Sequence, residues 1–302
     1  MTNALINSTE IQTLLDRIGG IDQHGGDPRK KLILRRIVSD LFSMIDDFDV
    51  TPEEFWHMVN FLQQGAAEFG LIAPGLGFDR FLDIRMDIAD QAAGIGAGTP
   101  RTIEGPLYVP GAPLTKSEAR LDDGTDHGET LIMHGRVLDT SGAPIPGAIV
   151  DVWHANTMGF YSYFDPTQSA YNNRRRIETD RDGSYKFRSV MPSGYAVPPG
   201  GATDRLLAAI GRHGRRPAHI HFFVSAPDFR HLTTQINIDG DPDLHEDFAY
   251  ATRDGLIPEV IRHKAAGGES PYAEIAFDFV LIQARNKGET NLSDRPRVSA
   301  QG

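Results

Sequence analysis

Residues 211–237 read GRHGRRPAHIHFFVSAPDFRHLTTQIN and contain two short runs that are typical of β-strands, at 218–224 and 233–238. The first run is short, apolar and β-branched, which predicts a buried strand. Alternate side chains of a strand share one face and lie about 6.6 Å apart, at roughly 3.3 Å per residue. His219 and His221 can therefore turn toward one ion, while the residues that alternate with them face the opposite layer.

Polar residues gather around this His-x-His pair. Arg216 stands just before the first run, and Gln235 lies on the second. Burying this many polar groups together is costly unless a charged group collects them. The stretch therefore favours a metal site, although a bare His-x-His is about as often two unrelated histidines in a sheet.

The remaining ligands determine which metal such a site would hold. The chain has no cysteine, which excludes thiolate zinc sites, iron–sulfur clusters and disulfides. A carboxylate beside two histidines would indicate non-haem Fe(II), but no Glu follows the second histidine as it does in cupins. The candidates are tyrosines beside glycine and proline: Tyr161 in GFYSYFD at 159–165, and Tyr195 in MPSGYAVPPG at 191–200.

A neutral tyrosine is a poor metal ligand, because the ordinary pKa of its phenol is about 10. Only a strongly charged hard cation makes the phenolate form easily, and ferric iron does so. Two phenolates and one hydroxide neutralise a 3+ ion, and neutral imidazoles fill the other positions. Either tyrosine alone would be interpreted as a half-buried surface anchor, but beside two strand histidines the pair indicates oxidised iron.

Four segments together resemble the intradiol ring-cleaving dioxygenases, in particular the catechol 1,2-dioxygenases, and the likeness covers nearly the whole chain. They are TPRTIEGPLYV at 99–109, DVWHAN at 151–156, PSGY at 192–195 and GRHGRRPAHIH at 211–221. The resemblance implies one non-haem Fe(III) per subunit, held by Tyr161, Tyr195, His219 and His221.

The resemblance also implies a reaction, in which catechol and O2 give cis,cis-muconate during the degradation of aromatic compounds by a β-ketoadipate type pathway. Tyr195 would accept a proton from catechol and leave the metal. Arg216 would stabilise negative charge beside the ring, and Gln235 would orient oxygen. The family's substrate pocket falls on Leu71, Pro74, Ile103, Gly105, Pro106 and Phe248.

Composition limits the partners of the protein. Lys and Arg number 30 against 41 Asp and Glu, and the formal charge of −11 over 302 residues disfavours nucleic acid and anionic membranes. Residues 1–20 lack a basic start followed by an apolar core, and no apolar run approaches the roughly 20 residues of a membrane span. We therefore expect a soluble cytoplasmic protein with no membrane span and no bound nucleic acid.

Residues 1–105 are expected to form a helical N-terminal arm and a linker. Three apolar stripes at helical spacing follow N-cap signals at Asn7, Asp27 and Thr51. A helix-like piece at 79–90 lies inside the Gly- and Pro-rich linker. The stripes need a partner surface, and they could pack within the chain alone. The resemblance implies instead a homodimer through these helices, with a phospholipid in an apolar tunnel at the interface.

Residues 106–302 are expected to form the catalytic domain. Short β-like runs follow one another without intervening helices, at 130–139, 148–153, 183–190, 218–224, 233–238 and 274–282. This order predicts a mixed, mainly β fold, with an antiparallel β-sandwich catalytic domain behind an N-terminal α-helical dimerisation domain. The polar tail at 286–302 is expected at the surface.

Two alternatives stay open. Within the family, chlorocatechol or hydroxyquinol could be the preferred substrate, because one methylene of pocket volume discriminates by only about 1–3 kcal/mol. The bulky Leu71, Ile103 and Phe248 favour plain catechol. In another class, the protein could be a metal-free β-sandwich binding module, because residues 135–150 also resemble sandwich domains that only bind. Iron content separates an enzyme from such a module.

Overall fold

The computed structural model describes residues 5–96, 98–265, 270–292 and 297. It divides the chain into two compact units, Met1–Ala66 and Ala67–Gly302. Among the described residues, no helix is both long and apolar enough to cross a bilayer. The division expected at residue 105, between a helical arm and a catalytic domain, stays a prediction.

The first unit consists of helices that begin at strong N-caps. They are α1 (Thr9–Ile18), α2 (Pro28–Asp47) and α3 (Pro52–Gly65). Asp27 accepts hydrogen bonds from two backbone N–H groups of α2, and Thr51 forms a reciprocal capping box with Glu54, as the sequence predicts. The expected cap at Asn7 is wrong by one residue, because the side chain that accepts a backbone N–H of α1 belongs to Ser8.

The helices of the first unit leave much of their apolar surface uncovered. No residue of α2 is buried, and its Leu32 and Ile37 are 61% and 52% exposed. In α1, Leu15 is the buried residue. The stripes that the sequence shows are therefore only partly covered within the described chain.

Further helices belong to the second unit. A 3₁₀ turn, η1 (Ala66–Glu68), leads into α4 (Phe69–Gly75), which α5 (Phe78–Ala92) and α6 (Ala202–Ala209) follow. The helix expected at 79–90 is confirmed as α5, whereas α4 and α6 were not expected. Glu68 supplies the cap of α6, since its carboxylate accepts the N–H groups of Ala202 and Thr203, both at 2.9 Å. A cap that comes from 134 residues away leaves no local signal.

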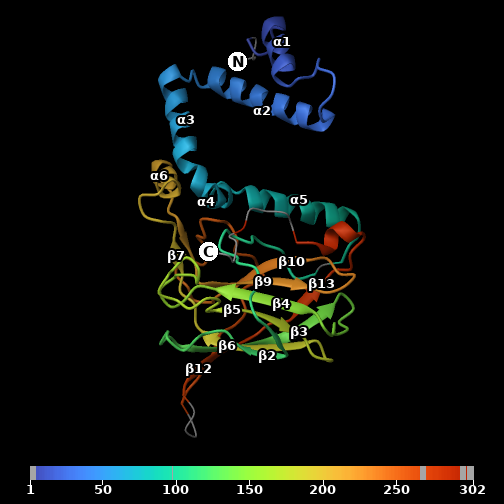
Figure 1. Cartoon of the computed structure of the whole chain (residues 1–302), viewed down its shortest axis with the longest axis vertical. Coiled ribbons are helices and arrows are strands. Elements are labelled where there is room, and N and C mark those ends of the chain that lie inside the picture. The colour runs from blue at the N-terminus through green and yellow to red at the C-terminus, as the bar shows by residue number, and fades with distance from the viewer. Residues whose placement is uncertain (1–4, 97, 266–269, 293–296, 298–302) are drawn as a thin grey trace. The chain divides into compact units, whose positions relative to one another are not determined.

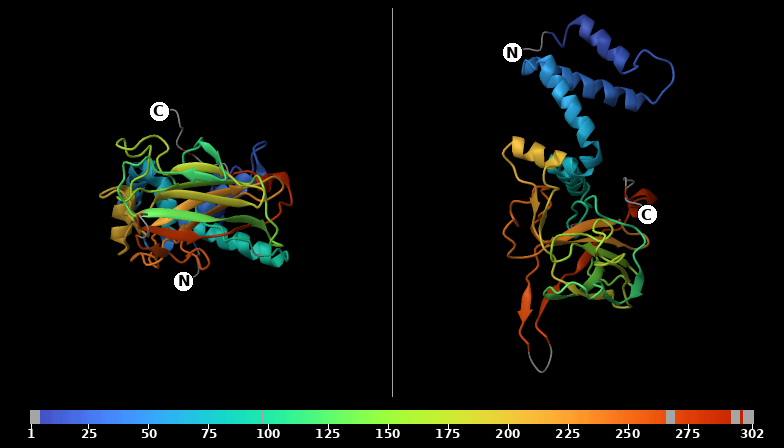
Figure 2. Two further views of the ribbon diagram at one scale, coloured as in Figure 1. Left: turned by 90° about the horizontal axis from the view of Figure 1, so that it is seen from below. Right: turned by 60° about the vertical axis from the view of Figure 1, so that its left-hand side comes forward.

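The second unit also contains a sandwich of two sheets, which Figures 1 and 2 show as layers. The first sheet runs in the order β1 (Leu114–Lys116), β5 (Arg174–Glu178), β4 (Ile149–His154), β9 (His219–Ser225), β10 (Leu232–Asn237). The second runs in the order β11 (Ile261–His263), β12 (Tyr272–Ala276), β3 (Thr130–Asp139), β6 (Ser184–Val190), β2 (Glu118–Arg120), and β13 (Phe279–Leu281) also pairs with β3. β7 (Tyr195–Ala196) and β8 (Arg215–Arg216) form a separate small ribbon.

Both sheets are mixed in direction. The central pairs β4–β9, β9–β10 and β3–β6 are antiparallel, as expected, and so is the edge pair β11–β12. In contrast, β1 pairs in parallel with β5, β2 with β6, and both β12 and β13 with β3. The run expected at 274–282 is divided between β12 and β13. The parallel strands reach their neighbours through long connections, which the short turn signals of the sequence do not reveal.

The main core fills the space between the sheets and fixes the orientation of β9. Ile220, Phe222 and Val224 are fully buried in this core. Because side chains alternate along a strand, His219 and His221 face away from the core, on the other side of the first sheet. The prediction that the histidines share one face and the apolar residues the other is confirmed.

Candidate metal centre and active site

Cross-strand register brings the polar residues to the outer face of the first sheet. Gln235 lies opposite His221 between β10 and β9, and Trp153 lies opposite the same histidine between β4 and β9. In the small ribbon, Tyr195 lies opposite Arg216. Residues that are far apart in the sequence thus become neighbours because two pairings meet at β9.

The two histidines converge on one point. Their Nε2 atoms are 3.1 Å apart, and both side chains are 1% exposed. Nδ1 of His219 lies 2.6 Å from the carbonyl oxygen of Pro217, which makes it a donor and leaves a lone pair on Nε2. Burial, helped by the nearby Arg216, lowers the pKa of His219 to about 3, and burial together with His219 lowers the pKa of His221. Both rings are therefore neutral at physiological pH.

Two tyrosines stand beside the histidines. The Tyr161 hydroxyl is 3.5 Å from Nε2 of His219, and the Tyr161 side chain is 3% exposed. The Tyr161 and Tyr195 rings meet edge to face, with centroids 5.6 Å apart, and Tyr195 also packs against His219. Tyr195 is only half-buried. Burial, followed by the proximity of Tyr195, raises the pKa of Tyr161 well above its ordinary value, so its phenolate needs a cation beside it.

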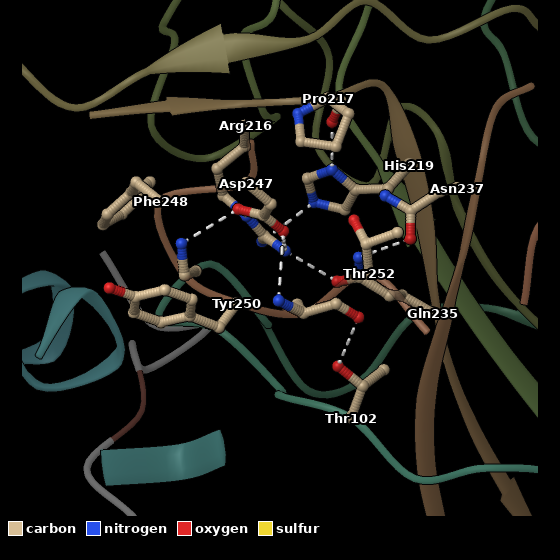
Figure 3. A network of polar contacts seen from close by, with 12 residues as sticks. Thr102, Arg216, Pro217, His219, Gln235, Asn237, Asp247, Phe248, Tyr250 and Thr252 are labelled. Carbon is tan, nitrogen blue, oxygen red and sulfur yellow. Dashed lines mark hydrogen bonds and ion pairs between the residues drawn. The ribbon is translucent and has the colours of Figure 1, made fainter. Parts of the chain in front are cut away.

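Arg216 lies at the centre of the polar network in Figure 3. Its guanidinium donates to Nε2 of His219 at 3.1 Å and to Oε1 of Gln235 at 2.8 Å. It also meets Asp247 with two bonds of 3.1 Å, and both side chains are almost fully buried. Burial opposes the charge of Arg216, but Asp247 together with the nearby Tyr195 and Tyr161 more than offsets burial, so the pKa of Arg216 is raised. The guanidinium is thus a permanent cation held beside the ligand cluster.

Asp247 was not predicted from the sequence. Its carboxylate also accepts the backbone N–H of Ala249 at 3.0 Å, which fixes the turn that carries Phe248. Burial would raise the pKa of Asp247, but Arg216, with help from His219 and the Ala249 N–H, more than offsets burial, so the pKa is lowered. A buried arginine needs an anion, and the acidic run before Phe248, Glu246-Asp247, was the available signal.

Trp153 and Arg174 were also missed, and both contact predicted ligands. The Trp153 indole stacks on His221, with ring centroids 4.9 Å apart and planes within 6°. The Arg174 guanidinium lies 5.7 Å from the centre of the Tyr161 ring and donates to the hydroxyl of Ser162 at 2.8 Å. Burial lowers the pKa of Arg174 to about 10. Arg174 is 1% exposed.

The predicted substrate residues surround the same face. An ideal Cβ on Gly105, where φ is +70°, would lie 3.6 Å from Cε1 of His221. Ile103 and Phe248 share a buried cluster. Leu71 and Pro74 lie on α4, where Cβ positions on Gly70 and Gly75 would contact Pro106 and Phe248. Gly105 thus lies beside His221, and Ile103 packs in one cluster with Phe248, whereas the contact of all six residues with a substrate stays a prediction.

The two histidine nitrogens are spaced so that they could share one metal ion. Two nitrogens that are each about 2.0–2.1 Å from one ion, at a right angle, lie about 3 Å apart, close to the 3.1 Å between His219 and His221. In the described part of the chain, no three His, Asp or Glu side chains are grouped to hold a metal. The oxygen that lies beside the two histidines is the Tyr161 hydroxyl.

Comparison with known proteins gives consistent matches. A family model for a dioxygenase matches residues 103–283, and one for the catechol dioxygenase N terminus matches residues 27–94. The catechol 1,2-dioxygenase of Acinetobacter baylyi is 50% identical over 306 residues, covering 98% of each chain, and catechol 1,2-dioxygenase 2 of Acinetobacter lwoffii is 60% identical over 257 residues, covering 84% of this chain and 94% of its own. The crystal structure of a mercury-inhibited catechol 1,2-dioxygenase from Acinetobacter sp. ADP1 superimposes with a TM-score of 0.94 at 50% identity, over 98% of this chain and 99% of its own.

Relatives with other names are less similar. A chlorocatechol 1,2-dioxygenase of Rhodococcus opacus is 37% identical over 68% of this chain and 80% of its own. A hydroxyquinol 1,2-dioxygenase of Nocardioides simplex is 31% identical over 90% of this chain and 96% of its own.

Proposed function

Because the chain belongs to the intradiol dioxygenase family, we propose that it cleaves catechol with O2 between the two hydroxyl-bearing carbons to give cis,cis-muconate. The observation that carries this proposal is the convergence of two buried, neutral imidazoles and the Tyr161 phenol within 3.5 Å, beside a permanently charged Arg216. Burying these polar groups together costs free energy, and a metal-free binding module would not require it.

The proposed cofactor is one Fe(III) per subunit, with Tyr161, Tyr195, His219 and His221 as its protein ligands. Two phenolates offset most of the 3+ charge, and the imidazoles add none because their pKa values are lowered. When bound, ferric iron supplies Lewis acid character, which draws electron density from a chelated catechol. The fit of the donor set to a hard cation supports this choice.

Each polar side chain of the site has a separate role in the proposed reaction. Tyr195 is the less buried of the two tyrosines and is placed to take a proton from catechol. Tyr161 is almost fully buried, so it would be a phenolate only with the iron beside it, and it would remain a ligand throughout. Arg216 presents a cation to the negative charge that develops beside the ring, and Gln235 is held by Arg216 at one end and by Asn237 at the other. The wall around Ile103 and Phe248 excludes water.

Plain catechol is the proposed preferred substrate. Relatives that are at least half identical to this chain are named for catechol, whereas those named for chlorocatechol and hydroxyquinol share about a third of their residues with it. The buried Ile103 and Phe248 narrow the wall and support the smaller ring. Substituted catechols remain secondary substrates in this proposal.

The proposed assembly is a homodimer through the N-terminal helices, with a phospholipid in an apolar tunnel at the interface. The exposed apolar side chains of α2 support it, because a monomer would leave them in water. Native mass spectrometry of the purified protein tests both points. A monomer without lipid would contradict this part of the proposal, while the proposed site, which lies within the second unit, would still stand.

The activity is tested by mixing the iron-loaded protein with catechol and following oxygen uptake and muconate absorbance together. Equal consumption of catechol and O2 with formation of cis,cis-muconate is expected. Iron-loaded protein that consumes no oxygen would contradict the proposed function and favour the binding module.

A further inference from the structure

Residues 99–106, here called the cover segment, pass over the site and are fixed unevenly along their length. The first part, 99–102, is held by hydrogen bonds at Thr102. The Thr102 N–H donates to the carbonyl of Thr233 at 3.0 Å, and the Thr102 hydroxyl donates to the carbonyl of Ala251 at 3.1 Å. Among the described residues, none of 103–107 forms a backbone–backbone hydrogen bond. The second part, which contains Ile103 and Gly105, therefore depends on side chains for its position.

Glu104 provides an anchor in this second part. Its side chain is 3% exposed, and both carboxylate oxygens are bonded by Arg297, Oε1 by Nε at 2.7 Å and Oε2 by Nη2 at 2.8 Å. This is a parallel, two-point pairing of guanidinium and carboxylate, the strongest geometry for such a pair. The two residues are 193 positions apart.

The C-terminal segment approaches the site at a second point. Leu292 packs against the aromatic cluster that contains Tyr108, Trp153 and Tyr161. Just before it, η2 (Lys287–Thr290) is held to the sheet by a hydrogen bond from the His231 N–H to the carbonyl of Glu289. Of the segment expected at the surface, residues 293–296 and 298–302 lie outside the described part of the chain, whereas the described Arg297 pairs with a buried carboxylate.

Removing Arg297 would leave the Glu104 carboxylate buried without its guanidinium. An uncompensated buried charge is strongly unfavourable, and moving Glu104 toward water would relieve it. That movement would draw Gly105 away from the His221 ring and Ile103 away from Phe248. The metal ligands lie on other segments, so they would keep their places.

We propose that Arg297 is a positioning residue for the substrate wall: its ion pair with Glu104 holds residues 103–106 against His221 and so sets how tightly catechol binds. The inference rests on the proposed function for its substrate, but the ion pair itself is independent of it. A C-terminal arginine thereby controls an active-site wall that it does not line.

The test compares wild type with Arg297→Ala, and with Arg285→Ala as matched control. Arg285 belongs to the same terminal region, pairs with Glu289 and is 57% exposed, so its loss leaves the cover segment untouched. For Arg297→Ala we expect KM for catechol to rise about tenfold, equivalent to about 1.4 kcal/mol, while kcat, iron content and colour stay close to wild type. A general structural defect would lower kcat and iron content together.

Hydrogen exchange of the iron-free proteins gives a readout that needs neither iron nor turnover. Arg297→Ala should increase deuterium uptake in peptides that cover 99–109, and Arg285→Ala should not. The double variant Glu104→Gln/Arg297→Ala also removes the unpaired Glu104 carboxylate. Its KM and deuterium uptake should therefore lie between those of Arg297→Ala and those of wild type. Arg297→Lys, which keeps the charge but loses the two-point geometry, should fall between.

Wild-type KM and exchange in Arg297→Ala would overturn the proposal, as would equal loss of kcat and iron. If Arg297→Ala does not fold, wild-type KM and exchange in the double variant would overturn it instead. If wild type itself does not turn over catechol, the proposed function fails, and the exchange experiment still decides whether the pair positions the segment.

Discussion

Removing the carboxylate of Asp247 is the most informative perturbation of the site. Asp247 touches neither of the two histidines, yet it gives Arg216 its only carboxylate partner among the described contacts. The Asp247 side chain is 1% exposed and that of Arg216 is 3% exposed. Asp247→Ala therefore leaves a guanidinium buried without an anion, whereas Asp247→Asn keeps the shape and one acceptor but removes the charge.

The expected loss of stability and activity follows from the burial of the Arg216–Asp247 ion pair. Breaking a buried ion pair by removing one partner costs about 3–5 kcal/mol of unfolding free energy, which is the expected loss for Asp247→Ala. In Asp247→Asn, the loss of one hydrogen bond to a charged group is worth about 2 kcal/mol. If this loss falls on the transition state that Arg216 stabilises, kcat/KM drops about 30-fold. Iron content should not change, because the proposed ligands are untouched.

Urea unfolding gives the stability, and catechol turnover with iron analysis gives the activity. The matched control is Asp243→Asn, four residues earlier, whose carboxylate pairs with Arg215 at 2.9 Å. That arginine is 51% exposed, so the pair is worth less than about 1 kcal/mol and its loss should leave turnover unchanged. Wild-type kcat/KM in Asp247→Asn, or iron loss in that variant, would refute the role assigned to Arg216.

Three further predictions follow from the site. His219→Ala and Tyr195→Phe should lose iron or turnover, whereas Arg216→Ala should keep its iron and lose turnover; metal analysis with an oxygen electrode checks this, and full activity in the first two would contradict the ligand assignment. Burial raises the pKa of Asp151 from 3.8 to about 7 against the opposing hydrogen bond from Tyr108, so its contribution to stability is full below pH about 4 and is lost as pH rises to about 7. Between pH 5 and pH 8, the unfolding free energy measured by urea titration should therefore fall less in Asp151→Asn than in wild type. An equal fall in the two proteins would contradict the raised pKa of Asp151. Phe248→Ala should raise the ratio of kcat/KM for a chlorocatechol to kcat/KM for catechol about tenfold or more, because a change in pocket volume discriminates by about 1–3 kcal/mol. An unchanged ratio would show that Phe248 does not restrict the size of the substrate ring.

The sequence predicts those parts of the site that depend on local pattern. His219 and His221 share a face because a strand alternates, and the fully buried Ile220 and Phe222 confirm that alternation. Helix starts at Asp27 and Thr51 were found because capping is a matter of three or four neighbouring residues. The family resemblance supplied the tyrosines' role, which periodicity alone could not.

The parts that were missed depend on contacts between distant residues. Asp247 lies 31 residues from Arg216, and the cap of α6 comes from Glu68, 134 residues away. Arg297 was expected at the surface because its neighbours are polar, and its partner is set by the path of the chain. Buried charges need counter-charges, so a sequence can indicate that a partner is required but not which one the fold will bring.

The visible spectrum of the iron-loaded protein, before and after anaerobic addition of catechol, tests the central claim most directly. Tyrosine phenolate bound to ferric iron gives a broad charge-transfer band, and chelation of catechol should move this band to longer wavelength. Seeing both would establish the oxidation state, the phenolate ligands and the substrate class together. A protein that stays colourless after ferric reconstitution, or a band that catechol does not shift, would contradict the claim that Tyr161, Tyr195, His219 and His221 form a catechol-binding ferric site.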